Sequence, residues 1–170
     1  MDFGDVLAVM IAAMAVGVAV WSAHQSYRAS QAQMITKILD DYGAAEMAEA
    51  LTSLGKLRDK VSPEVRESWR TCDPAAANGI WQTATSHDGY VDLHRRHVHW
   101  FYKNAWQLYE KKFLGKTAME IVTGTNGYAL LFEVVWGLSR TKHILTFGEP
   151  DDERFRWFEK MQSAFPVSET

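Results

Sequence analysis

The sequence predicts an all-α protein in three parts: a transmembrane anchor over residues 1–23, a juxtamembrane helical stalk over residues 24–60, and a small cytoplasmic helical bundle over residues 61–170. Three observations predict this fold class. An uncharged apolar run opens the chain, apolar residues recur at helical spacing after it, and no segment alternates apolar and polar residues as a half-buried strand does. The composition, with 47% hydrophobic and 23% charged residues, is that of a globular chain and excludes a disordered one.

The apolar run extends from Val6 to Trp21 and contains no charged side chain. As a helix it is roughly 24 Å long, and the stretch from Gly4 to Ala23 reaches about 30 Å, the thickness of a bilayer's hydrocarbon core. A cleaved signal peptide is one alternative, although the residues before the run are acidic rather than basic. A buried helix of a soluble protein is the other.

The distribution of positive charge predicts the orientation of this anchor. All 18 Lys and Arg residues lie after residue 27, beginning with Arg28. The positive-inside rule therefore predicts an N-terminus outside and a cytoplasmic body. Trp21 and Tyr27 lie where interfacial aromatic residues are expected. The single cysteine, Cys72, excludes an intrachain disulfide and suits a cytoplasmic body.

The anchor also carries small residues four positions apart, a spacing that lets helices approach closely in lipid. The pattern favours self-association or packing on another membrane protein, and a generic Ala-rich anchor is the alternative. The residues concerned are Ala8, Ala12, Ala13, Ala15, Gly17 and Ala19. The expected partners are thus the lipid bilayer and a membrane protein. With a net charge of −3, the chain has no basic excess that would indicate nucleic-acid binding.

Beyond the anchor, the apolar residues from Met34 to Leu57 form the stripe of an amphipathic helix, with a break expected at Gly43. Ser62 before Pro63 predicts the start of a short helix. The stretch from 73 to 89 is expected to be a loop that contains one short helix, over 75–83.

The second half of the chain predicts more helices. Thr117 and Glu120 have the spacing of a capping box, and Asn126 with Gly127 is typical of a turn. Helices are therefore expected over 88–114, 117–124 and 128–140, with a last one opened by the acidic residues 151–153. The apolar helix 128–140 is expected at the centre of the core.

One cluster of side chains, between His94 and His99, suggests chemistry. On a helix, His94 and His97 lie on adjacent turns of one face, and an acidic ligand such as Asp92 or Glu120 would complete a metal site. No known metal-binding spacing accompanies them, and a packing or solvated role is the alternative. The sequence assigns no catalytic residue and no cofactor, because it contains no nucleotide-binding glycine loop and no nucleophile elbow.

Arg95, Arg96 and Lys103 form a small basic face on the same predicted helix. For a body held at a membrane, anionic lipid headgroups are the expected ligand of such a face. Solvated side chains with no ligand are the alternative.

The order of these segments resembles a known family. It is carried by the aromatic helix from 99 to 109, the link from 113 to 116, the short helix from 118 to 122, and the apolar helix that contains Trp136 and ends at Arg140. These segments resemble the bacterial domain of unknown function 4760, whose members are small, helical and often membrane-anchored. The similarity is loose over residues 5–60 and closer over 90–160, and the chain departs from it in the His-rich segment and in residues 73–89. The resemblance implies an architecture and brings no catalytic residues.

The expected function is therefore that of a single-pass membrane-anchored interaction protein, a scaffold or small accessory subunit of a membrane assembly. A membrane-tethered sensor or regulator is one alternative, in which the stalk relays between the lipid surface and the body. A metal-dependent enzyme that uses His94 and His97 is the other.

Overall fold

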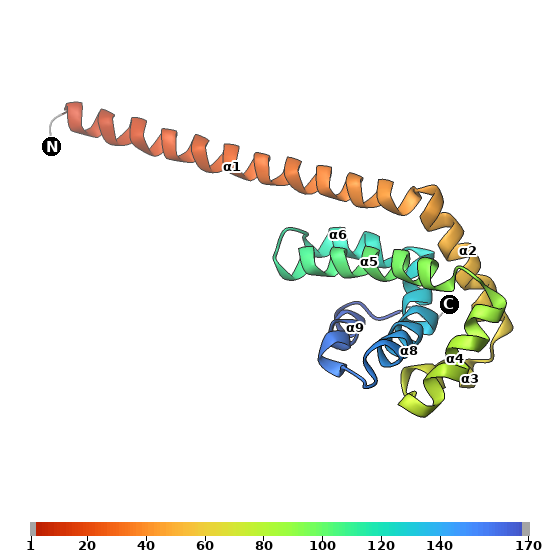
Figure 1. Ribbon diagram of the computed structural model, residues 1–170. Helices are drawn as coiled ribbons and strands as arrows, with labels where there is room; N and C mark the ends of the chain where they lie inside the picture. Colours follow the sequence, from red (N-terminus) through yellow and green to blue (C-terminus); the bar gives the residue numbers. More distant parts are fainter. Residues whose placement is uncertain (1–2, 168–170) are drawn as a thin grey trace.

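A computed structural model describes the backbone of residues 3–167 and the side chains of residues 10–167. Every regular element in this part is helical, so the predicted all-α fold class is confirmed. The elements are α1 (Phe3–Gly43), α2 (Ala45–Lys60), α3 (Pro63–Arg70), α4 (Pro74–His87), α5 (Val91–Glu110), α6 (Lys116–Thr123), α7 (Asn126–Leu130), the π-helix η1 (Leu131–Val135), α8 (Trp136–Phe147) and α9 (Asp152–Ala164). Figure 1 shows α1 as one long rod that leaves a bundle formed by the other helices.

The chain turns sharply between α1 and α2, as the glycine at position 43 predicts. Ala44 takes an extended conformation (ψ 147°), and α2 then packs across α5. Four side chains of α2 are buried there: Met47, Ala50, Leu54 and Leu57. The predicted stalk, residues 24–60, is thus divided in the structure, because α2 belongs to the core and only the first half of α1 stands clear of the body.

Two capped starts define α3 and α4. The Ser62 side chain accepts a hydrogen bond within the first turn of α3, and Pro63 occupies the first helical position, as predicted. Asp73 and Pro74 repeat this arrangement at α4. The short helix predicted over 75–83 is therefore confirmed, but it is longer than predicted: α4 covers Pro74–His87, and the loop expected after residue 83 is wrong as far as His87. The Asp-Pro pair is a helix start here rather than a turn.

The capping box predicted at Thr117 is also wrong. Gly115 is the N-cap of α6 and the helix has no side-chain cap, so Thr117 lies inside the first turn. The backbone N–H of Gly115 instead donates to Gln31 Oε1 on α1, at 3.0 Å. A partner from another helix thus replaces the local cap.

The predicted turn at Asn126 and Gly127 is the start of a helix. α7, η1 and α8 follow one another without a break, so the central apolar helix extends over 126–147 rather than 128–140. Gly127 is required by close packing, because a Cβ there would lie 2.7 Å from Leu51 Cδ2 and 2.9 Å from the Tyr102 hydroxyl oxygen. Its N–H donates to the Tyr42 hydroxyl at 3.0 Å.

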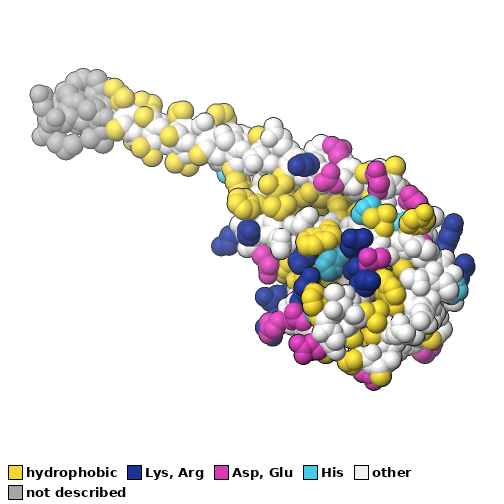
Figure 2. Space-filling model, in the orientation of Figure 1, with side chains coloured by type: hydrophobic (Ala, Val, Ile, Leu, Met, Phe, Trp, Pro, Cys, Tyr) yellow, Lys and Arg dark blue, Asp and Glu magenta, His cyan; other side chains and the backbone are white. Residues whose placement is uncertain are grey.

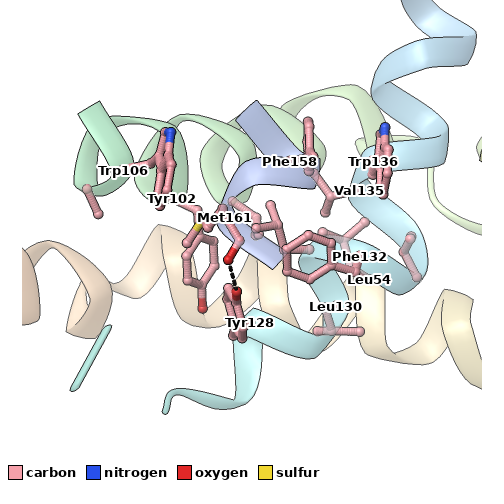
Figure 3. Close-up of a cluster of buried hydrophobic side chains, with 14 of the residues drawn as sticks. Leu54, Tyr102, Trp106, Tyr128, Leu130, Phe132, Val135, Trp136, Phe158 and Met161 are labelled. Carbon is pink, nitrogen blue, oxygen red and sulfur yellow. Dashed lines mark hydrogen bonds between the residues drawn. The ribbon is translucent and has the colours of Figure 1, made fainter. Parts of the chain in front are cut away.

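The core lies where α2, α5, α8 and α9 meet (Figure 3). Phe158 of α9 is fully buried and stacks on Trp136 of α8, with ring centroids 5.3 Å apart and planes 8° from parallel. The Tyr128 hydroxyl shares its proton between the Phe165 carbonyl at 2.5 Å and the Met161 carbonyl at 3.3 Å, and Figure 3 draws the second of these bonds. This aromatic contact and these hydrogen bonds fix α9 against the central helix.

Replacing Gly137 of α8 with alanine is expected to lower the free energy of unfolding by about 1–3 kcal/mol. A Cβ at this position would lie 2.7 Å from Trp69 Cβ and 3.2 Å from the Trp69 backbone carbon, so α3 would have to move. Denaturant unfolding in detergent solution measures the change.

Gly79→Ala is the matched control, because Gly79 lies in α4 and a Cβ there meets no atom within 4 Å. This variant is expected to be as stable as the parent or up to about 1 kcal/mol more stable, from helix propensity alone. Equal stability of the two alanine variants would contradict the close α3–α8 packing.

Candidate functional site

The projecting part of α1 carries uncovered apolar side chains. Met10, Val16 and Trp21 are 58%, 63% and 64% exposed, and the other large apolar residues between them are exposed to a similar degree. Figure 2 shows these hydrophobic atoms along the rod between the body and the part of the chain that is drawn in grey. A continuous apolar surface of this kind is typical of a segment covered by lipid or by a partner.

The predicted membrane span over residues 4–23 is not supported by the described residues. Within that part of the chain, no helix is both long enough and apolar enough to cross a membrane. The span begins in residues 4–9, whose side chains, Ala8 among them, lie outside the described residues. The remaining small residues of the predicted packing face are exposed in the structure: Ala12, Ala13, Ala15, Gly17 and Ala19.

The loop between α5 and α6 is tied to α1 just after this apolar segment. The Tyr27 hydroxyl donates to the Lys112 carbonyl at 3.4 Å, and the Gln31 amide donates to the Phe113 carbonyl. Phe113 is 54% exposed at the tip of this loop. Figure 1 shows α5 and α6 extending beneath the rod, and the hydrogen bonds from Tyr27 and Gln31 join this end of the body to α1.

His94 joins a buried group of polar side chains at the start of α5. Its Nδ1 lies 2.6 Å from Asp88 Oδ2, which also accepts a hydrogen bond from the Ser53 hydroxyl at 2.7 Å. The other oxygen of Asp88 accepts from the Tyr90 N–H at 2.9 Å. Burial would raise the pKa of Asp88, but these hydrogen bonds outweigh it and leave the pKa below its usual range. The group ties α2 to the junction of α4 and α5.

The predicted metal site has no support in the structure. Among the described residues, no three His, Cys, Asp or Glu side chains gather as metal ligands. His97 lines a separate groove of about 770 Å³ between α1, α2 and α5. Asp92 is engaged by Arg95, at 2.6 Å, and Glu120 lies on α6 beside Lys116.

The three residues of the predicted basic face meet in a small pocket between α5, α8 and α9. Arg95, Arg96 and Lys103 line this pocket of about 210 Å³, which we call the basic pocket. Other helices add Lys142, His143 and Arg154, and His99 comes from α5. No Asp or Glu of the described residues lines it. Figure 2 shows Lys, Arg and His side chains gathered on the face of the body below the rod.

Arg95 is the fixed centre of the basic pocket. The residue is 8% exposed, and its guanidinium donates to Asp92 Oδ1 at 2.6 Å and to Ser139 Oγ at 3.1 Å. Ser139 Oγ lies 3.2 Å from His99 Nδ1. Ser139 Oγ thus joins the guanidinium of Arg95 to the imidazole of His99. Arg95 Nε is buried without a hydrogen-bond partner among the described residues.

The cations of the basic pocket act on one another. Burial, followed by the positive charges of Arg95, Lys103 and Arg154, lowers the pKa of His99 to about 3, so its ring is neutral at pH 7. Burial and then Arg154 also lower the pKa values of Lys103 and His143. The site therefore holds an excess of positive charge that an anion would relieve.

Sequence reasoning missed the cations contributed by α8 and α9. Lys142 and Arg154 lie far along the chain from α5, and neither belongs to a motif. For Lys142 the only signal in the sequence is its helical spacing. It follows Ser139 by three residues, and so lies on the same side of α8 as the residue that contacts Arg95. Which face of α8 meets α5 is decided by packing, which the sequence alone does not reveal.

The chain matches no protein-family model, no curated protein and no solved structure. The resemblance to the domain of unknown function 4760 therefore stays a prediction. The class of protein is therefore described from the fold and the site: an all-α body from which an apolar helix projects and which carries the basic pocket.

Proposed function

We propose that this protein is a membrane-tethered interaction protein of the bacterial inner membrane, with the first part of α1 in the bilayer and the helical body in the cytoplasm. The observation that carries the proposal is the exposure of every large apolar side chain described between Met10 and Trp21. Moving one such side chain out of water contributes about 1.5–3 kcal/mol, and the segment contains several. A surface of this kind gains free energy when lipid or another apolar partner covers it.

The loop between α5 and α6 supports the same orientation. With residues 4–23 in the bilayer, Tyr27 lies at the cytoplasmic surface. Phe113 lies there too, because Tyr27 and Gln31 hold its loop against α1. Lys111, Lys112 and Lys116 lie within three residues of Phe113 in the sequence. An exposed aromatic residue in a lysine-rich segment suits the headgroup region of an anionic membrane.

The body acts in this proposal as a binding module, the scaffold or accessory subunit of an assembly. The exposed small residues of α1 offer a face for a second helix, from another copy or from a different membrane protein. A tethered sensor is the second candidate, and the observation that favours it is the basic pocket, a ligand-sized site in the body.

The tether is tested by extracting membranes with alkaline carbonate. The full chain is expected to stay in the pellet and to need detergent for release. The double variant Val16→Asp, Val18→Asp is expected to move to the supernatant, because each carboxylate costs about 3 kcal/mol at the centre of a bilayer.

Val65→Asp with Ile121→Asp is the control pair, since both residues are 45% exposed on the body, in α3 and α6. This control is expected to stay with the membrane. Release of the unmodified chain by carbonate, or equal release of both double variants, would count against the tether.

A further inference from the structure

We propose that the basic pocket is a binding site for a phosphate monoester. The site lies on the body, between α5, α8 and α9, and its chemistry does not depend on the membrane tether. It therefore adds a ligand to the proposed function, and it can be tested without a bilayer.

The charge of the basic pocket selects an anion. Five cationic side chains line it: Arg95, Arg96, Lys103, Lys142 and Arg154. The last three make no ion pair with any described residue, and two of them lie over indole rings instead, Lys103 at 5.0 Å from Trp100 and Lys142 at 4.7 Å from Trp81. The carboxylate of Asp92 contacts Arg95 and Arg96 from outside the lining of the pocket. A cleft lined by charges of one sign attracts ions of the other sign, so this lining favours an anion.

The donors of the pocket favour phosphate. Arg95 is held rigidly by Asp92 and Ser139, and its buried Nε has no partner among the described residues. A preorganised guanidinium matches the oxygens of a phosphate group, and little side-chain entropy is lost when it binds. The neutral imidazole of His99 lies in the same lining.

The size of the pocket limits the rest of the ligand. Its volume of about 210 Å³ leaves room for a phosphate group and a short carbon chain. Trp100, Phe147 and Phe155 give the lining apolar surface for that carbon chain.

A phosphate monoester can be a soluble metabolite or the headgroup of a phosphatidate lipid, and the position of the pocket favours the soluble source. His99 precedes Lys112, the residue bonded to Tyr27, by 13 positions, which is about 20 Å along a helix. If the tether holds as proposed, the pocket lies about that far from the headgroups.

Titration calorimetry of the full chain in a phosphate-free detergent tests the site, with glycerol 3-phosphate as the probe and potassium chloride at equal ionic strength as the blank. Saturable binding is expected. Lys142→Gln with Arg154→Gln is expected to weaken it at least tenfold, since it removes two charged donors worth about 1.5–3 kcal/mol each.

Arg156→Gln with Lys160→Gln is the matched control, because it removes the same charge from α9 outside the lining of the pocket. It is expected to change the affinity less than twofold. If the first double variant does not fold, Arg154→Gln alone, at an exposed position, must still weaken binding more than Arg156→Gln does.

A second arm of the experiment identifies the source of the phosphate monoester. It measures binding of the protein to nanodiscs of phosphatidylcholine with and without phosphatidate. Binding of glycerol 3-phosphate in detergent supports a soluble ligand, and binding only to phosphatidate nanodiscs, lost on removing Lys142 and Arg154, assigns the pocket to a lipid. No saturable binding in either arm, or equal losses in the two double variants, would overturn the proposal. Since the detergent arm needs no bilayer, its result is independent of whether the tether exists.

Discussion

Replacing Phe158 with alanine is expected to lower the free energy of unfolding by about 3–5 kcal/mol. The ring is fully buried and stacks on Trp136, and it also contacts His99, Phe132 and Phe155. Its removal leaves a cavity between α9 and the central helix that rigid aromatic neighbours cannot fill. The variant thus loses both the transfer free energy of the ring and the contacts that fix α9.

Denaturant unfolding followed by tryptophan fluorescence measures this loss, since Trp136 and Trp157 lie beside the ring. Phe147→Ala is the control, because Phe147 is 62% exposed at the end of α8. It is expected to change stability by less than about 1 kcal/mol. If both variants lost the same stability, α9 would not be packed as described.

The second large effect is expected at Asp88. Asp88→Asn is expected to lower the free energy of unfolding by about 1.5–3 kcal/mol, because it removes a half-buried carboxylate that accepts hydrogen bonds from Ser53, from the Tyr90 N–H and from the imidazole of His94. Asp73→Asn is the matched control at the exposed N-cap of α4. Asparagine caps a helix as well as aspartate does, so this control is expected to change stability by only a few tenths of a kcal/mol.

The pH dependence of the same variant gives a second readout. The pKa of Asp88 is lowered in the folded protein, because the hydrogen bonds outweigh the effect of burial, so the unfolded chain takes up the proton first as the pH falls. The stability that the Asp88 carboxylate contributes is therefore complete above the ordinary pKa of Asp, near pH 4. That stability is lost as the pH falls through the lowered pKa of the folded protein. The difference in stability between the parent and Asp88→Asn should shrink below about pH 4. A difference independent of pH would mean that Asp88 does not act as a charged acceptor.

Much of the fold could be predicted from local signals. Ser62 with Pro63 correctly predicts the start of α3, Asp151 caps α9, and Gly43 precedes the turn into α2. The errors occur where a distant partner overrides a local pattern. Gly115 caps α6 because Gln31 accepts its N–H, and Gly127 is a packing glycine beside Tyr102 rather than half of a turn.

The candidate site could be predicted only in part, for the same reason. Arg95, Arg96 and Lys103 lie on one predicted helix, so their proximity follows from helical periodicity. Lys142 and Arg154 reach the pocket through the packing of α8 and α9 on α5, which depends on tertiary contacts. The histidines mislead because their chemical type suggests metal binding. In the structure His94 is bonded to Asp88, and His97 lines the separate groove between α1, α2 and α5.

The most direct test of the tether is a measurement of which residues lipid covers. In a Cys72→Ala background, single cysteines replace Val16, Phe113 and Gln82, and each carries an environment-sensitive fluorophore in vesicles that contain quenchers at known depths. The tether predicts quenching of position 16 from the acyl chains, of position 113 from the headgroups, and of position 82, on the exposed face of α4, from neither depth. If position 16 is quenched no more than position 82, lipid does not cover α1 and the membrane-tethered account is wrong.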